Sequence, residues 1–168
     1  MSYTEAALIL GELGLAHPPV ALAIVDTKPA DINVKSSRVV ASCALWRAAE
    51  VELFFASAED HRGCAVGAHV MGLPLSANTR QELAGAVALM SEVGYLPASE
   101  AADIPQVHNS GTGVVYGPLA SFPLSADCAV VWVNPGRALS TLAGDLMQAL
   151  NSNHTMLGYY QDKKHAFA

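Results

Sequence analysis

The chain has 168 residues, of which 52% are hydrophobic and 14% are charged, and its formal net charge is −6. Disordered chains are rich in charge and poor in hydrophobic residues, so this composition excludes a disordered protein. A negative charge without a clustered basic face argues against a protein that binds duplex nucleic acid.

Strand-like and helix-like segments alternate in the first part of the chain. Residues 4–12 predict a helix capped by Thr4, and the apolar run 20–25 predicts a strand buried on both faces. Residues 38–40 are compatible with extended backbone, and residues 44–50 are typical of a helix. Residues 52–56 predict the next strand.

Two helices are expected in the middle of the chain. Asp60 is placed to cap a short helix over residues 63–71, which the glycine and proline that follow bring to an end. Asn78 or Thr79 can cap the next helix, which ends before residue 94. Its apolar residues recur at helical spacing, as on the apolar face of an amphipathic helix.

The last part of the chain predicts two more strands and a helix. The strands cover residues 113–116 and 129–133, and the helix runs from 134 to about 150. A long stretch without a clear element, 97–113, precedes them. The alternation indicates the α/β class, with α+β as the alternative. We expect a single compact domain over residues 1–168, with a mixed sheet and flanking helices.

The densest group of reactive side chains lies in residues 59–69. If a helix begins near residue 63, Cys64 lies in its first turn, where the helix dipole and free N–H groups favour a thiolate. His61 is the adjacent proton acceptor or metal ligand. His69 follows Cys64 by five residues and does not share its helix face closely, so Cys64 and His61 are the tighter pair.

Three interpretations of these residues remain open. In the first, Cys64 and His61 bind a metal together with Cys43, which begins another apparent helix. In the second, Cys64 is a nucleophile or redox thiol and His61 is its base. In the third, both cysteines are small buried hydrophobic residues and His61 is a surface residue that follows a cap.

Two other positions carry weaker signals. Arg137 opens the helix that follows a strand, where it can assist an anion bound at the helix N-terminus, or simply be an exposed arginine in an ordinary turn. Cys128 enters an apolar strand and is expected to be buried and inert.

Several sequence blocks together resemble domain-of-unknown-function family 169, a bacterial and archaeal family. The matching blocks are residues 18–21, 43–48, 59–68 and 113–119, followed by Asp127 and residues 134–135. The resemblance implies that Cys43, His61 and Cys64 belong to the pattern of that family. It does not imply an activity.

These observations lead us to expect a small protein that binds a metal or iron cofactor, haem or an iron–sulfur cluster, through Cys43, His61 and Cys64. Arg137 is a further candidate for cofactor binding. The alternatives are a cofactor-free cysteine-dependent enzyme acting on a small molecule, with Cys64 and His61 as catalytic residues, and a non-catalytic domain that binds or senses an apolar ligand.

The sequence also predicts a location and an assembly. Three cysteines without a signal peptide favour the reducing cytoplasm, and no apolar run approaches the roughly 20 residues that a bilayer requires. The low charge and long apolar strands favour self-association as a homodimer. Apart from a second copy, a small-molecule ligand or cofactor is the expected partner.

Overall fold

The computed structural model describes residues 1–12, 15, 17–35, 42–97, 99–100, 104, 106–107 and 111–132, with backbone alone for residues 42 and 43. Contacts divide the described residues into two compact units. The first unit holds the described residues within Met1–Ala23 and Ala49–Glu52 and those from Gly117 onward, and the second holds the described residues within Ile24–Ala48 and Leu53–Tyr116. The predicted elements at 38–40 and 134–150 lie outside the described residues.

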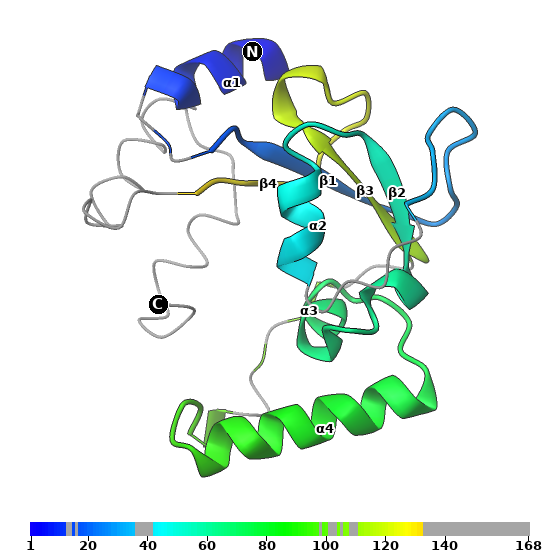
Figure 1. Ribbon diagram of the computed structural model, residues 1–168, viewed down its shortest axis with the longest axis vertical. Coiled ribbons are helices and arrows are strands. Elements are labelled where there is room, and N and C mark those ends of the chain that lie inside the picture. Colours follow the sequence, from blue (N-terminus) through cyan, green and yellow to red (C-terminus); the bar gives the residue numbers. More distant parts are fainter. Residues whose placement is uncertain are drawn as a thin grey trace. The chain divides into compact units, whose positions relative to one another are not determined.

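In the first unit, helix α1 (Tyr3–Glu12) lies beside the 3₁₀ helix η3 (Leu119–Ser121) (Figure 1). The cap of α1 is Ser2 rather than Thr4. Glu5 N donates to Ser2 Oγ over 3.2 Å, and Ser2 N donates to Glu5 Oε2 over 2.6 Å. This reciprocal pair is a capping box, and it leaves the Thr4 hydroxyl free to donate to Ala120 O over 3.0 Å.

Four strands form one sheet, hydrogen-bonded in the order β2-β3-β1-β4. The strands are β1 (Val20–Val25), β2 (Phe54–Ser57), β3 (Gly113–Pro118) and β4 (Cys128–Val130). β1 pairs antiparallel with β4, and β2 pairs antiparallel with β3. A parallel bridge joins Val34 to Phe55. The combination of helices and a sheet confirms the predicted class, a protein with both α and β structure.

The strand predicted at 20–25 matches β1 from end to end, and its first four residues are buried. β2 begins two residues later than predicted, and β3 continues two residues further. The buried core of the second unit gathers around β2 and β3, where Phe54 and Tyr116 are both 0% exposed. Their rings stack, with centroids 5.5 Å apart.

The helices of the second unit are α2 (Ser42–Ala48), the 3₁₀ helix η1 (Ala58–His61), α3 (Ala65–Val70) and α4 (Ala77–Glu92). Helix α4 begins after Ser76, whose Oγ accepts from Thr79 N over 3.1 Å, so neither Asn78 nor Thr79 is the cap. Positive φ angles of 68° and 75° at Gly72 and Gly94 follow the ends of α3 and α4, as the sequence predicts.

None of the helices in the described part of the chain has both the length and the hydropathy needed to cross a membrane.

The pairing of β2 with β3 predicts a strict requirement for glycine at position 113. A Cβ at Gly113 would lie 2.5 Å from Phe55 Cζ and 2.6 Å from the backbone oxygen of Ala56. Because such overpacking forces buried groups apart, we expect Gly113→Ala to lower the free energy of unfolding by about 1–3 kcal/mol. Urea unfolding followed by circular dichroism measures this change.

Gly85, in the middle of α4, provides the matched control, because a Cβ there meets no atom within 4 Å. Gly85→Ala is expected to raise the free energy of unfolding by about 0.5–1 kcal/mol, since alanine favours the helix. Equal stability of the two variants would contradict the close approach of β2 and β3.

Candidate functional site

His61 is the most buried polar side chain near the predicted reactive segment, with 0% of its surface exposed. Its Nδ1 lies 2.6 Å from Ser57 O, and its Nε2 lies 2.6 Å from the hydroxyl of Tyr116. A carbonyl oxygen only accepts, so Nδ1 carries the proton and donates. In the neutral ring Nε2 therefore accepts, and the Tyr116 hydroxyl donates to it.

Burial lowers the pKa of His61 below its ordinary value of 6.5, and the Ser57 carbonyl and the charge of Asp60 partly offset this effect. Asp60 is itself held, because its Oδ2 accepts from Ser57 N over 2.8 Å and from Ser57 Oγ over 2.6 Å. Asp60 is the third residue of η1 and forms a capping box with the N-cap residue Ser57, so it does not cap the helix that the sequence predicted. His61 is thus a neutral, fixed side chain around neutral pH.

The Tyr116 hydroxyl also contacts Met71 Sδ, at 3.6 Å. A phenolic hydroxyl has one proton, so it donates either to His61 Nε2 or to the sulfur. Imidazole nitrogen is the stronger acceptor, which directs the proton to His61 while the ring is neutral. When His61 is charged, Nε2 donates instead, and the Tyr116 proton turns to Met71.

Cys64 closes the turn that His61 begins. Cys64 N donates to His61 O over 2.9 Å, and Cys64 O accepts from Ala68 N over 3.0 Å. Cys64 is half-buried and is the N-cap residue of α3, one position before the first turn in which the sequence placed it. The structure thus joins Cys64 and His61 through the backbone, while both ring nitrogens of His61 bond to other residues.

The proposed three-ligand cofactor site is only partly described. Cys43 lies in α2, but its side chain is outside the described part of the chain, as is Arg137. Among the described residues, no group of three His, Cys, Asp or Glu side chains is arranged to hold a metal ion. His61 is also poorly suited to be a metal ligand, because it would have to break its hydrogen bond to Tyr116 or Ser57.

Cys128, in β4, is half-buried like Cys64 and not fully buried as the sequence predicted. Burial, with a smaller contribution from the charge of Asp127, raises the pKa of the Cys128 thiol to about 11. The thiol therefore stays protonated near neutral pH, as expected of an unreactive cysteine.

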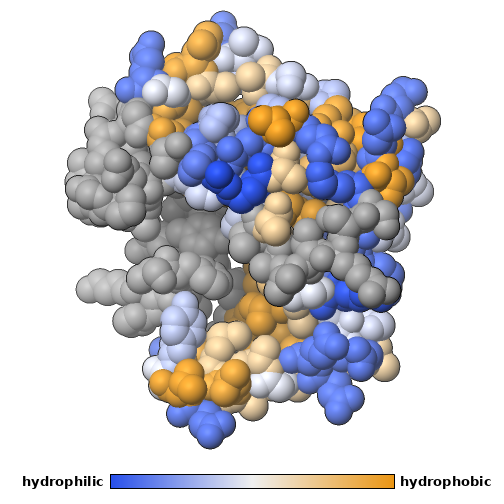
Figure 2. Space-filling view, viewed as in Figure 1, coloured by the Kyte–Doolittle hydropathy of each residue, from blue (hydrophilic) through white to orange (hydrophobic). Residues whose placement is uncertain are grey.

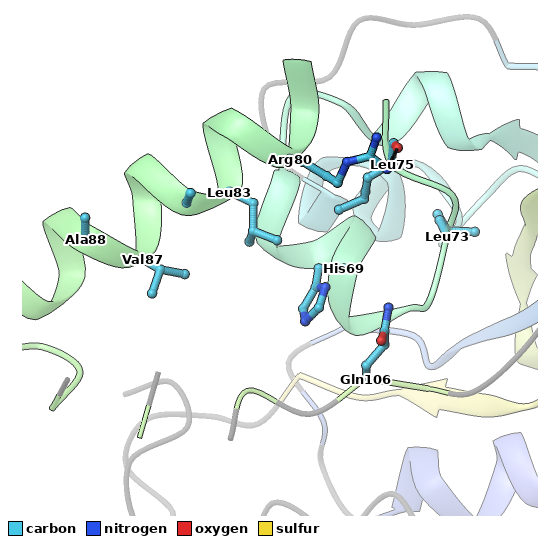
Figure 3. Close-up of a pocket in the computed structure, with 9 residues that line it drawn as sticks. His69, Leu73, Leu75, Arg80, Leu83, Val87, Ala88 and Gln106 are labelled. Atoms are coloured by element: carbon cyan, nitrogen blue, oxygen red, sulfur yellow. Dashed lines mark hydrogen bonds between the residues drawn. The ribbon is translucent and has the colours of Figure 1, made fainter. Parts of the chain in front are cut away.

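A feature that the sequence did not indicate is an open groove between α3 and α4, with a volume of about 710 Å³ (Figure 3). Its apolar lining consists of Leu73, Leu75, Leu83, Ala84, Val87 and Ala88. Its polar lining consists of His69, Arg80 and Gln106. In the space-filling view, apolar side chains gather over the C-terminal part of α4, and polar side chains cover its N-terminal part (Figure 2).

Helix α4 forms one wall of this groove because its apolar side chains recur every three or four residues. Leu83 and Val87 project toward the side on which His69 of α3 lies, and both are only half-buried (Figure 3). Thr79 is the buried residue of α4. Leu83 and Val87, which the sequence places at helical spacing, therefore line a groove and not a closed core.

Arg80 lies at the rim of the groove with its guanidinium fixed by the backbone. Its Nη1 donates to Leu75 O over 2.8 Å. Within the described part of the chain, no carboxylate forms an ion pair with it. One of five guanidinium N–H donors is used, so the others remain available.

The buried, neutral state of His61 predicts a pH dependence of stability. Between pH 6.5 and the lower pKa in the folded protein, the unfolded chain binds a proton that the folded chain does not. Stability should therefore fall as the pH is lowered through this range. In His61→Gln the contribution of His61 to this fall in stability should disappear, although the variant is less stable at pH 7.

The measurement is the free energy of unfolding at a series of pH values for both proteins, taken as a difference curve so that other titrating groups cancel. A difference curve that is flat from pH 7 to pH 5 would contradict the neutral His61.

Comparisons with known proteins give a family and no activity. No curated protein and no solved structure matches the chain. The model of a family described as uncharacterised ArCR matches residues 9–158, which include Cys43, His61 and Cys64 as well as the α3–α4 groove. This match confirms the resemblance seen in the sequence blocks, and the chain belongs to domain-of-unknown-function family 169 (DUF169).

Proposed function

We propose that the chain is a non-catalytic binding protein for a small, largely apolar molecule, which occupies the α3–α4 groove. The observation that carries this proposal is the groove itself. Its volume of about 710 Å³ lies within the roughly 300–1,000 Å³ of small-molecule sites, and its lining is mainly aliphatic. Such sites combine an apolar surface with a few polar groups that orient the ligand, here His69, Arg80 and Gln106.

The composition of the lining favours binding over catalysis. Among the described residues that line the groove there is no thiol, hydroxyl or carboxylate group that can act as a nucleophile. The histidine with the lowered pKa, His61, is not part of the lining and is committed to Ser57 and Tyr116. The described lining therefore offers apolar contact and hydrogen bonds, and it contains no matched nucleophile and base.

The expected affinity is modest. At about 0.3 kcal/mol per non-hydrogen atom, a ligand of about 20 such atoms gains about 6 kcal/mol, which corresponds to a Kd of the order of tens of micromolar. Titration calorimetry with uncharged long-chain amides covers this range and leaves the charge of the ligand out of the test.

Val87→Asp tests the groove because it places a carboxylate on the apolar wall. We expect at least a tenfold weaker binding of the neutral amide, since an ionised group must be desolvated when the ligand covers it. Leu89→Asp is the matched control: Leu89 lies on the same helix, is 60% exposed and is not part of the lining. Equal affinities of the two variants, or no binding of any neutral amide by the native protein, would contradict the proposal.

A second candidate function rests on Cys64. We propose that Cys64, together with Cys43, is able to hold a haem or an iron–sulfur cluster, which would supply redox chemistry. Cys64 and Cys128 are both free thiols, but the pKa of about 11 keeps Cys128 protonated. That leaves Cys64, fixed at the start of α3, as the thiol better suited to binding or reaction. Free thiols also support the cytoplasmic location.

The test is the absorption spectrum and metal content of anaerobically purified protein. We expect a Soret band or a broad thiolate-to-iron band, abolished in Cys64→Ala and retained in Cys128→Ala. Full occupancy in Cys64→Ala would end this proposal. A colourless, metal-free native protein that alkylates rapidly at Cys64 would instead favour the cofactor-free cysteine enzyme.

A further inference from the structure

The lining of the α3–α4 groove includes a cation, Arg80, whose charge is not neutralised by the described residues. Arg80 bonds to the carbonyl of Leu75 and to no described carboxylate. By contrast, Arg62 lies 3.5 Å from the carboxylate of Glu59. Arg62 therefore has a carboxylate partner, whereas Arg80 has none among the described residues. Of the two, Arg80 lines the groove.

The acid nearest to Arg80 in α4 does not fill this role. Glu82 lies two residues further on, and residues two apart do not face each other on a helix. Its Oε1 accepts from Asn78 Nδ2 over 2.8 Å. None of the described lining residues is acidic, so among them an anion that enters the groove meets Arg80 without a competing carboxylate.

The bond to Leu75 also prepares Arg80 for a ligand. It restrains a long side chain that otherwise loses entropy on binding, and it uses one N–H of the guanidinium. The planar fork that remains matches a carboxylate, which accepts two parallel hydrogen bonds. Gln106 and His69 add further hydrogen-bonding groups to the same groove.

The apolar wall continues from Arg80 along one stripe of α4. Positions 80, 83, 84, 87 and 88 follow the helical repeat, so they lie on one side of the helix. At 1.5 Å per residue, the stripe extends about 12 Å from Arg80 to Ala88. A head group at Arg80 would therefore leave an extended apolar tail lying over Leu83 and Val87.

We infer that the ligand of this groove is an amphipathic monoanion, an aliphatic carboxylate, whose head group is bound by Arg80 and whose tail lies along α4. This inference rests on the proposed binding function and adds the chemical class of the ligand. The cation, its missing acidic partner within the described residues and the apolar stripe beside it carry the inference together.

The experiment compares decanoate with decanamide, which share a tail and differ in charge. Calorimetric titrations are run at pH 7.5, below the concentration at which decanoate forms micelles. We expect the native protein to bind decanoate at least tenfold more tightly than decanamide. In Arg80→Gln this preference should fall to within twofold while the affinity for decanamide is retained. Arg80→Lys, which keeps the charge and loses the fork, should retain part of the preference.

Arg62→Gln is the control, because it removes the same charge outside the groove and should keep the full preference for decanoate. Equal binding of acid and amide by the native protein, or an undiminished preference in Arg80→Gln, would overturn the inference and leave the proposed function intact. Failure of both ligands to bind would overturn the proposed function, and the inference with it.

Discussion

The arrangement of β2, β3 and the start of α3 depends on the hydrogen bonds of the buried His61 ring. They tie the end of β2, through Ser57 O, to β3, through the Tyr116 hydroxyl. Because the ring is fully buried, each of its nitrogens must find a partner inside the protein, and loss of either partner leaves a costly unsatisfied group. The fixed ring in turn sets the position of the His61 carbonyl, which accepts from Cys64 N at the start of α3. The positions of Cys64 and of helix α3, which carries His69, therefore depend on the two hydrogen bonds of the His61 ring.

The groove follows from how little of α4 is buried. Helix α4 packs against α3, yet of its sixteen residues Thr79 alone is buried. Its remaining apolar side chains are half-buried or exposed, among them Val87 and Leu89. An apolar excess in a weakly charged chain must be covered by a core, a ligand or another subunit. On the α3 side of α4, the aliphatic lining and the volume of the groove suit a small ligand.

Local patterns predicted the elements well, and long-range contacts account for what they missed. The strand β1 and the helix ends at the glycines after α3 and α4 could be predicted, because a buried strand is a continuous apolar run and a positive φ favours glycine. The caps were harder, since several residues near each helix start can accept a hydrogen bond. Ser2, with Glu5 three residues later, was the available signal for α1. The partner of His61 lies 55 residues away, and no local pattern indicates that contact. An amphipathic stripe such as that of α4 looks the same in a sequence whether it faces a core or a groove.

The arrangement of α3 bears on whether the chain catalyses a reaction. An enzyme that uses Cys64 and His61 as nucleophile and base needs the imidazole to accept the thiol proton. In the structure the lone pair of His61 Nε2 is occupied by the Tyr116 hydroxyl, and Nδ1 is bonded to Ser57 O. The groove, in turn, includes His69 from the same short helix but not Cys64. Cys64, at the N-cap of α3, is thus not part of the groove lining, and the His61 ring bonds to Ser57 and Tyr116 and holds β2 and β3 together. A binding role requires no change in this arrangement, whereas catalysis through this pair requires His61 to break a buried hydrogen bond.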